Sequence, residues 1–213
     1  QGMVERGLKK RFAIQASLEI GTDDELLAWL RSAGCFLVLV GIESVEAGTL
    51  EHLRKATNLR VGVGRYREAI ANIQRNGMAV SGSLIFGHDA DTQETFRGLE
   101  AFVTESGVDS PVYNILTPYP GTDLRVRLEE EGRLLDLDLP RDYALFDAHH
   151  VTYRPLAVSA DELLMANQEA VRRDTSGLVL VRDLWRTWRR TGSLLAALAS
   201  FQNRRWARLD VDR

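Results

Sequence analysis

Apolar and polar positions along the chain follow two alternating patterns, one typical of strands and the other of helices. Residues 12–17 (FAIQAS) alternate, and residues 35–42 (CFLVLVGI) form a continuous apolar run, as in a strand covered on both faces. Apolar side chains recur every three or four positions in residues 65–76, which predicts a helix. The same reasoning predicts strands at 79–87, 112–116 and 150–153, helices at 25–32, 46–55, 92–105, 123–131 and 159–173, a polar loop up to residue 64, and a helical remainder.

This order of elements predicts an α/β protein with a parallel sheet and helices on its faces. A change near Pro155 divides the chain into a sheet-forming part, residues 1–155, and an all-helical part, residues 156–213. A chain of 213 residues is long enough to bury one substantial core.

Composition excludes several classes of protein. With a net charge of −3, the chain has no overall basic field, so we expect no nucleic-acid partner. It contains neither a run of about 18–20 apolar residues nor the apolar core of a signal peptide, so we expect a cytoplasmic protein. The single cysteine, Cys35, excludes an internal disulfide and a cysteine-rich metal site, and we predict no metal ligands.

The C-terminal segment 182–208 departs from this average composition. It is rich in arginine and carries Trp185, Trp188 and Trp206. Such a segment can pack on the rest of the fold, touch an anionic membrane surface or contact a partner. We favour packing, because tryptophans at helical spacing usually belong to a core.

Candidate ligand-binding residues lie at the ends of the predicted strands, where parallel sheets collect their ligands. Glu43 and Ser44 follow a buried strand, and a carboxylate there can accept hydrogen bonds from a ribose diol or an ammonium group. Alternatively, Ser44 caps a helix and Glu43 interacts with its dipole. Gly87 ends the predicted strand at 79–87 and is followed by an acid-rich loop. Thr117 and Pro118 begin a rigid turn after the predicted strand at 112–116. Four further polar side chains are candidates for lining a substrate space: Gln15, Ser17, Tyr113 and Asn114.

Taken in order, these segments resemble radical S-adenosylmethionine (SAM) proteins, in particular the subgroup with an upstream cobalamin-binding domain. The resemblance covers about residues 12–162 and rests on FAIQASLEI, SAGCFLVLVGIES, YREAIANIQRNGMAVSGSLIFGHDADTQETF, YNILTPYPGTDLRVRLEEEGRLL, YALFDAHHVTYRP and SADEL. It implies a partial, TIM-like (β/α)₆ barrel, incomplete at its N-terminal side and followed by a helical tail. It also implies a [4Fe–4S] cluster that cleaves SAM to a 5′-deoxyadenosyl radical, and possible use of cobalamin for methyl transfer.

The resemblance carries over to particular positions. Glu43 and Ser44 match a site for the ribose and methionine portion of SAM. Ser83, Ile85 and Gly87 match a motif that packs against adenosine, although Ser83 replaces its first glycine. Ala90 also stands where the family motif has its closing acidic residue. Thr117 and Pro118 match the last barrel turn, near the adenine.

The three-cysteine CxxxCxxC motif of the family does not occur in these 213 residues. The chain begins at Gln1, and its first strand matches the third strand of the family's barrel. We therefore expect these residues to be a portion of a larger enzyme, and we expect this portion to be inactive by itself. A degenerate module that binds a partner or a small molecule is the alternative. The missing barrel half or cobalamin domain would be a partner, and the edge of residues 12–17 would pair with a second copy or be covered by residues 1–11.

Overall fold

The computed structural model describes residues 1–52, 55–138 and 140–211. Within them, four parallel strands form one sheet in the order β1-β2-β3-β4, accompanied by ten α-helices, which confirms the α/β class with a parallel sheet. The strands are β1 (Phe12–Ser17), β2 (Cys35–Glu43), β3 (Ala79–Phe86) and β4 (Ser110–Ile115). The helices are α1 (Gly2–Glu5), α2 (Asp24–Ala33), α3 (Ala47–His52), α4 (Ala56–Val61), α5 (Tyr66–Arg75), α6 (Gln93–Ser106), α7 (Asp123–Glu130), α8 (Ala160–Asp174), α9 (Gly177–Thr191) and α10 (Leu194–Val211), with short 3₁₀ turns at Leu18–Thr22, Val63–Arg65 and Arg141–Leu145.

Most predicted helices form where capping residues and apolar stripes indicated them. Asp23 accepts a hydrogen bond from the backbone N–H of Leu26 at the start of α2, and Ser159 forms a capping box with Glu162 at the start of α8. The helix predicted at 46–55 is present as α3, although residues 53–54 of that prediction lie outside the described residues.

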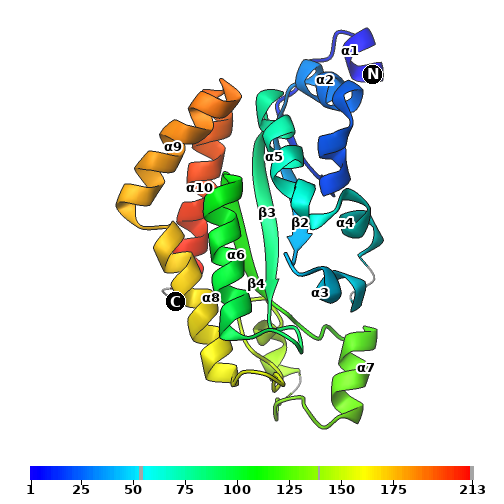
Figure 1. Ribbon diagram of the computed structural model, residues 1–213, viewed down its shortest axis with the longest axis vertical. Coiled ribbons are helices and arrows are strands. Elements are labelled where there is room, and N and C mark those ends of the chain that lie inside the picture. Colours follow the sequence, from blue (N-terminus) through cyan, green and yellow to red (C-terminus); the bar gives the residue numbers. More distant parts are fainter. Residues whose placement is uncertain (53–54, 139, 212–213) are drawn as a thin grey trace.

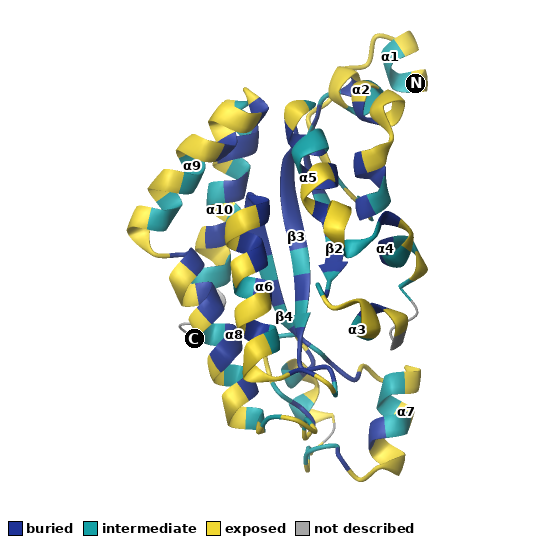
Figure 2. Cartoon of the chain, viewed as in Figure 1, coloured by how far each residue is buried: buried dark blue, intermediate teal, exposed yellow. Residues whose placement is uncertain are grey.

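The sheet lies between two sets of helices that cover different parts of its faces. Figure 1 shows α5 and α6 in front of β3, while α8, α9 and α10 gather along the β4 side. The front face carries the main apolar core, in which Phe86 of β3 stacks on Phe96 of α6 at 5.0 Å between ring centroids. On the other face, Ala196 of α10 packs against Leu37 and Ala79 near the amino ends of β2 and β3. In Figure 2 the buried colour follows the strands and the inward sides of these helices.

Two predicted elements are wrong. The segment 150–153 is not a strand of the sheet: Tyr153 makes an isolated antiparallel bridge with Leu134, and its side chain reaches back to the carbonyl of Gly87. The expected polar loop before residue 64 contains α4, because Asn58 and Val61 are buried against the sheet. In both segments, contacts with distant parts of the chain override the local polarity of the sequence.

Of the helices after Pro155, α8 and α10 pack directly on the sheet, and α9 packs mainly on α10. Leu163 and Val171 of α8 belong to the main apolar core, and α10 contacts β2, β3 and β4. At the other edge, β1 pairs with β2, while α1 packs on α2. Pairing of the β1 edge with a second copy stays a prediction. In the described chain, no helix has the length and apolar character needed to cross a bilayer.

Candidate functional site

The two faces of the sheet differ in chemistry because side chains alternate along each strand. On the face opposite α5 and α6, Ser17 of β1 lies in register with Gly41 of β2, and Gly41 with Ser83 of β3. Two residues after Ser83 along β3, Ile85 lies in register with Asn114 of β4. We call this surface the open face, formed by Gln15, Ser17, Gly41, Glu43, Ser83, Ile85 and Asn114. Its residues are exposed or half-buried, whereas the opposite face is almost fully buried.

Glu43 is the residue of the open face with the most unusual backbone. Its φ of +65° lies in the left-handed region, which residues with a side chain rarely adopt outside functional sites. This conformation directs the carboxylate back over Gly41, where a β-carbon would stand 2.5 Å from the Glu43 Oε1. Lys55 Nζ lies 3.2 Å from the same oxygen. The side chain of Glu43 is 14% exposed, so the carboxylate is held in place and still reachable.

Asn58 of α4 holds the carboxyl end of β2. Its Nδ2 donates to the carbonyl oxygens of Gly41 and Ile42, at 2.9 and 3.2 Å. Ser44 is buried, and its Oγ accepts a hydrogen bond from the N–H of Glu46 at 3.1 Å. That bond closes a local turn ahead of α3, which begins at Ala47, and is not a cap of that helix. The turn after β2 is therefore fixed from two sides.

Polar groups of β3 and β4 meet on the open face beside Glu43. Asn114 Nδ2 donates to Ser83 Oγ at 2.9 Å and lies 3.4 Å from the carbonyl oxygen of Leu84. The amide oxygen of Asn114 is left to accept a further hydrogen bond, and the Ser83 hydroxyl is left to donate one. Tyr113, adjacent to Asn114, lies on the opposite face, where it is buried against Phe86 and donates to Asp174.

Gly87 lies at the carboxyl end of β3 under a covering layer. Its φ of +103° and the closeness of Tyr153 and Leu163, within 2.8 Å of where a β-carbon would stand, both require glycine. The hydroxyl of Tyr153 donates to the Gly87 carbonyl oxygen. The backbone N–H groups of Gly87 and His88 both donate to Asp91 Oδ2, at 2.9 and 3.0 Å.

Asp91 is buried, with 1% of its surface exposed. Burial raises the pKa of its carboxyl to about 6, although the hydrogen bonds from the His88 and Gly87 backbone oppose this shift. Its other oxygen, Oδ1, accepts no hydrogen bond from the described residues. Burial likewise raises the pKa of Tyr153.

The last strand end is more closed. Thr117 and Pro118 are buried, and Thr117 Oγ1 donates to the Ile115 carbonyl oxygen at 2.9 Å. Glu43, Gly87 and Thr117 thus lie at the carboxyl ends of three adjacent strands, but only Glu43 is on the open face. A hollow of about 630 Å³ lies at the carboxyl end of β1, lined by Ser17, Glu19 and Thr22 among others.

Sequence reasoning missed several residues that shape these strand ends: Lys55, Asn58 and Tyr153. Each reaches the site through a tertiary contact, so no local pattern marked it. Asp91 belongs to the acid-rich loop that the sequence marked after Gly87, and it binds the backbone of that loop, whereas Thr92 caps α6.

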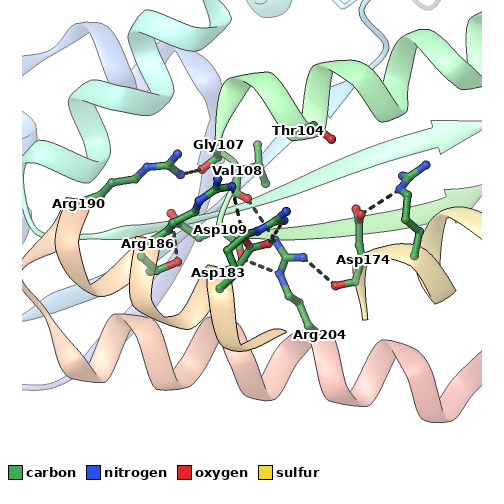
Figure 3. Close-up of polar contacts among 12 residues, drawn as sticks. Thr104, Gly107, Val108, Asp109, Asp174, Asp183, Arg186, Arg190 and Arg204 are labelled. Atoms are coloured by element: carbon green, nitrogen blue, oxygen red, sulfur yellow. Dashed lines mark hydrogen bonds and ion pairs between the residues drawn. The ribbon is translucent and has the colours of Figure 1, made fainter. Parts of the chain in front are cut away.

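A second polar cluster joins the C-terminal helices to β4 (Figure 3). Arg204 of α10 donates to the backbone oxygens of Asp109 and Asp174, at 2.8 and 2.9 Å, and pairs with Asp183 at 3.1 Å. Thr187 of α9 donates to Asp109 Oδ1 at 2.8 Å. We call these five residues the tail network. The cavity among them measures about 20 Å³, which is room for roughly one water molecule, so its polar groups bind each other rather than a ligand.

Among the described residues, no three His, Cys, Asp or Glu side chains lie together as a metal site. Cys35 is buried at the amino end of β2, where burial raises the pKa of its thiol. This position is at the far end of the strand from Glu43 and offers one thiol, while a [4Fe–4S] cluster requires several thiolate ligands. The residues present do not fit such a cluster.

The proteins to which this chain is similar are methyltransferases. The bacteriochlorophyllide d C-12(1)-methyltransferase of Chlorobaculum tepidum is 26% identical over 77% of this chain and 34% of its own length. The C-8(2)-methyltransferase of the same organism is 30% identical over 68% of this chain and 32% of its own length. The hopanoid C-2 methylase of Rhodopseudomonas palustris is 33% identical over 62% of this chain and 24% of its own length.

The chain therefore spans about a third or less of the length of these relatives. No protein-family model matches the chain.

Proposed function

We propose that the chain is the C-terminal portion of a radical SAM methyltransferase barrel, and that the open face contributes to binding SAM. The methyltransferase relatives support the reaction class, and the four consecutive parallel strands support part of a (β/α)₆ barrel. The single observation that carries the proposal is the Glu43 carboxylate, which a left-handed backbone and Lys55 hold over the open face at the end of β2.

The residues of the open face suit different parts of a nucleoside. The Glu43 carboxylate accepts hydrogen bonds from a ribose diol or from the ammonium group of the methionine portion. Ser83 and Asn114 add a hydroxyl and an amide, and Ile85 offers an apolar surface to the adenine. Gln15 and Ser17, exposed on β1, line the adjoining substrate space. Bound SAM would supply the methyl group, and its cleavage to a 5′-deoxyadenosyl radical would require one electron from a separate reductant.

Other carried-over positions have supporting roles in this proposal. Ser44 fixes the turn behind Glu43, and Thr117 and Pro118 shape the strand end near the adenine. Gly87 lets Tyr153 close over the end of β3. No step is assigned to a [4Fe–4S] cluster, because the residues present do not fit one. A cobalamin domain is proposed only through the resemblance.

The substrate class of the whole protein follows from its relatives, which are named for a bacteriochlorophyllide and a hopanoid. We propose an unactivated carbon of a lipid or a tetrapyrrole-like compound as the methyl acceptor. The alternative is a degenerate, non-catalytic module that binds a partner or a small molecule, and the single cysteine of these 213 residues is compatible with both readings.

Equilibrium binding of SAM to the chain, followed by NMR chemical shifts, tests the proposal. Glu43→Gln removes the charge and keeps the shape, so we expect about a tenfold loss of affinity, the worth of a hydrogen bond to a charged group. Glu94→Gln, an exposed glutamate of α6, is the control and should bind like the wild type. If SAM does not bind saturably, or both variants bind equally, the open face is not a SAM site and the degenerate module stands.

A further inference from the structure

The outer side of α9 is exposed although it carries large apolar residues. Leu178 is 89% exposed, Val181 67%, Trp185 54% and Trp188 49%. Their spacing of three, four and three residues places them in one stripe along the helix. Figure 2 shows α9 at the outside of the molecule, its outer turns in the exposed colour. The inward side of α9 is formed instead by the buried Thr187 and Thr191.

A basic stripe runs beside the apolar one. Arg182, Arg186 and Arg189 follow at spacings of four and three residues, and all three are exposed. The Arg189 guanidinium lies 4.9 Å from the centre of the Trp185 ring, so the two stripes meet in a cation–π contact. Asp183, the acidic residue of α9, pairs with Arg182 at 2.7 Å and lies 3.8 Å from Arg186, besides its pairing with Arg204 in the tail network, so it offsets part of the positive charge of the outer side. Arg189 contacts the Trp185 ring instead, and it keeps the positive charge of the stripe next to the apolar residues.

This arrangement distinguishes α9 from the rest of the protein. The chain as a whole has a net charge of −3, yet two of the three largely exposed tryptophans among the described residues, Trp185 and Trp188, lie on this helix beside exposed arginines. A helix with tryptophan and aliphatic residues next to arginines lies in the interface of a bilayer, with its apolar stripe among the acyl chains and its cations at anionic headgroups. In the described part of the chain no helix can cross a bilayer, so attachment would be along the surface.

The geometry points to α9 as a peripheral docking helix for an anionic lipid surface, and we propose this as a second binding function of the chain. The surface is defined by Leu178, Val181, Arg182, Trp185, Arg186, Trp188 and Arg189. It lies along the side of β4, whereas the open edge of the sheet is at β1, so a bound membrane leaves that edge free. The proposal does not depend on SAM binding.

Flotation with vesicles of phosphatidylcholine alone and with added phosphatidylglycerol tests it. We expect the wild-type chain to float with the anionic vesicles, to remain free with the neutral ones, and to be released by high salt. The tryptophan emission should shift to the blue on binding, because Trp185 and Trp188 leave water.

Two variants test the two stripes separately. Leu178→Ser with Trp185→Ser removes apolar contact, and Arg189→Glu reverses a charge; each should weaken vesicle binding about tenfold or more. Matched controls are Met165→Ser on α8, which is 53% exposed, and Arg97→Glu on α6, which is also exposed; both should bind like the wild type. Circular dichroism confirms that each variant is folded, which is expected because every changed residue is exposed.

Several outcomes would overturn the proposal. They are failure of the wild type to bind anionic vesicles, equal losses in the control variants, and unchanged binding by Arg189→Glu. Self-association of the chain without vesicle binding, lost in the α9 variants, would identify the helix as a protein interface instead.

Discussion

The tail network and the open face are both polar surfaces on one sheet, and they differ in how their hydrogen bonds are satisfied. In the tail network, Arg204 and Asp109 are nearly fully buried and their partners are protein groups at 2.8–3.1 Å. On the open face, Glu43 and Asn114 retain unused hydrogen-bonding capacity and reach solvent. Polar groups that satisfy each other hold a fold together, whereas polar groups that are fixed but incompletely bonded are available to a ligand.

The largest expected effect lies in the tail network. Arg204→Met removes every bond to the Asp109 and Asp174 carbonyls and leaves Asp183 without this partner, at a cost of about 3–5 kcal/mol in the free energy of unfolding. Urea denaturation measures it. Arg205→Met, at the adjacent exposed position, should change stability by less than about 0.5 kcal/mol. Equal effects of the two substitutions would mean that the network does not stabilise the fold.

A smaller effect is expected at Asp91, whose pKa of about 6 lies above its ordinary value of 3.8. The folded state therefore binds the proton more tightly than the unfolded state. The contribution of protonated Asp91 to the free energy of unfolding is therefore lost as the pH rises from about 4 to 6, by about 3 kcal/mol in total. Asp91→Asn has no proton to lose, so the free energy of unfolding of the wild type should fall relative to the variant across this window.

Asp89, two residues away, provides a control of opposite sign. Burial alone would raise the pKa of Asp89, but the hydrogen bond and charge of Arg133, aided by Arg127, lower it. The wild type should therefore gain stability relative to Asp89→Asn as the pH rises toward the ordinary pKa of an aspartate. Urea denaturation at a series of pH values measures both differences, and slopes of the same sign would contradict the two assignments.

The strained backbone of Glu43 gives a third, smaller effect. Glu43→Ala and Glu43→Gly both lose the carboxylate and its contact with Lys55, but only glycine adopts a φ of +65° without strain. The glycine variant should be more stable by about 1 kcal/mol, as measured by thermal unfolding, although neither variant should retain the proposed SAM affinity. If alanine were equally stable, the left-handed backbone would not be a local strain held for function.

Local patterns were sufficient to predict the four strands of the sheet, with a fifth at 150–153 that is absent from it, but only part of the site. The periodicity of residues 12–17 and the apolar run after Cys35 located β1 and β2, and strand alternation placed Gln15 and Ser17 together. Alternation also explains why Tyr113 and Asn114, as neighbours in β4, lie on opposite faces. The clamp of Asn58 on β2 joins residues 16 and 17 positions apart, and the bond of Tyr153 to Gly87 spans 66 positions. Such contacts depend on the assembled fold, and a single sequence contains no local sign of them.

The smallest expected effect tests how the tail is attached. Sequence periodicity predicted that the tryptophans of the tail pack into a core, but Trp185, Trp188 and Trp206 are 49–59% exposed, and the buried residues of α9 are Thr187 and Thr191 instead. Packing of α9 therefore depends on a hydroxyl bonded to Asp109 rather than on large apolar side chains. Trp185→Ser should change the free energy of unfolding by less than about 0.5 kcal/mol.

Thr187→Val is its matched comparison and should cost about 1–3 kcal/mol, because it leaves one oxygen of buried Asp109 without its donor. Urea denaturation of both variants decides between the two modes of attachment. A larger loss for Trp185 than for Thr187 would show that the apolar stripe of α9 stabilises the fold, and its exposure could then no longer be taken as a sign of an outside partner.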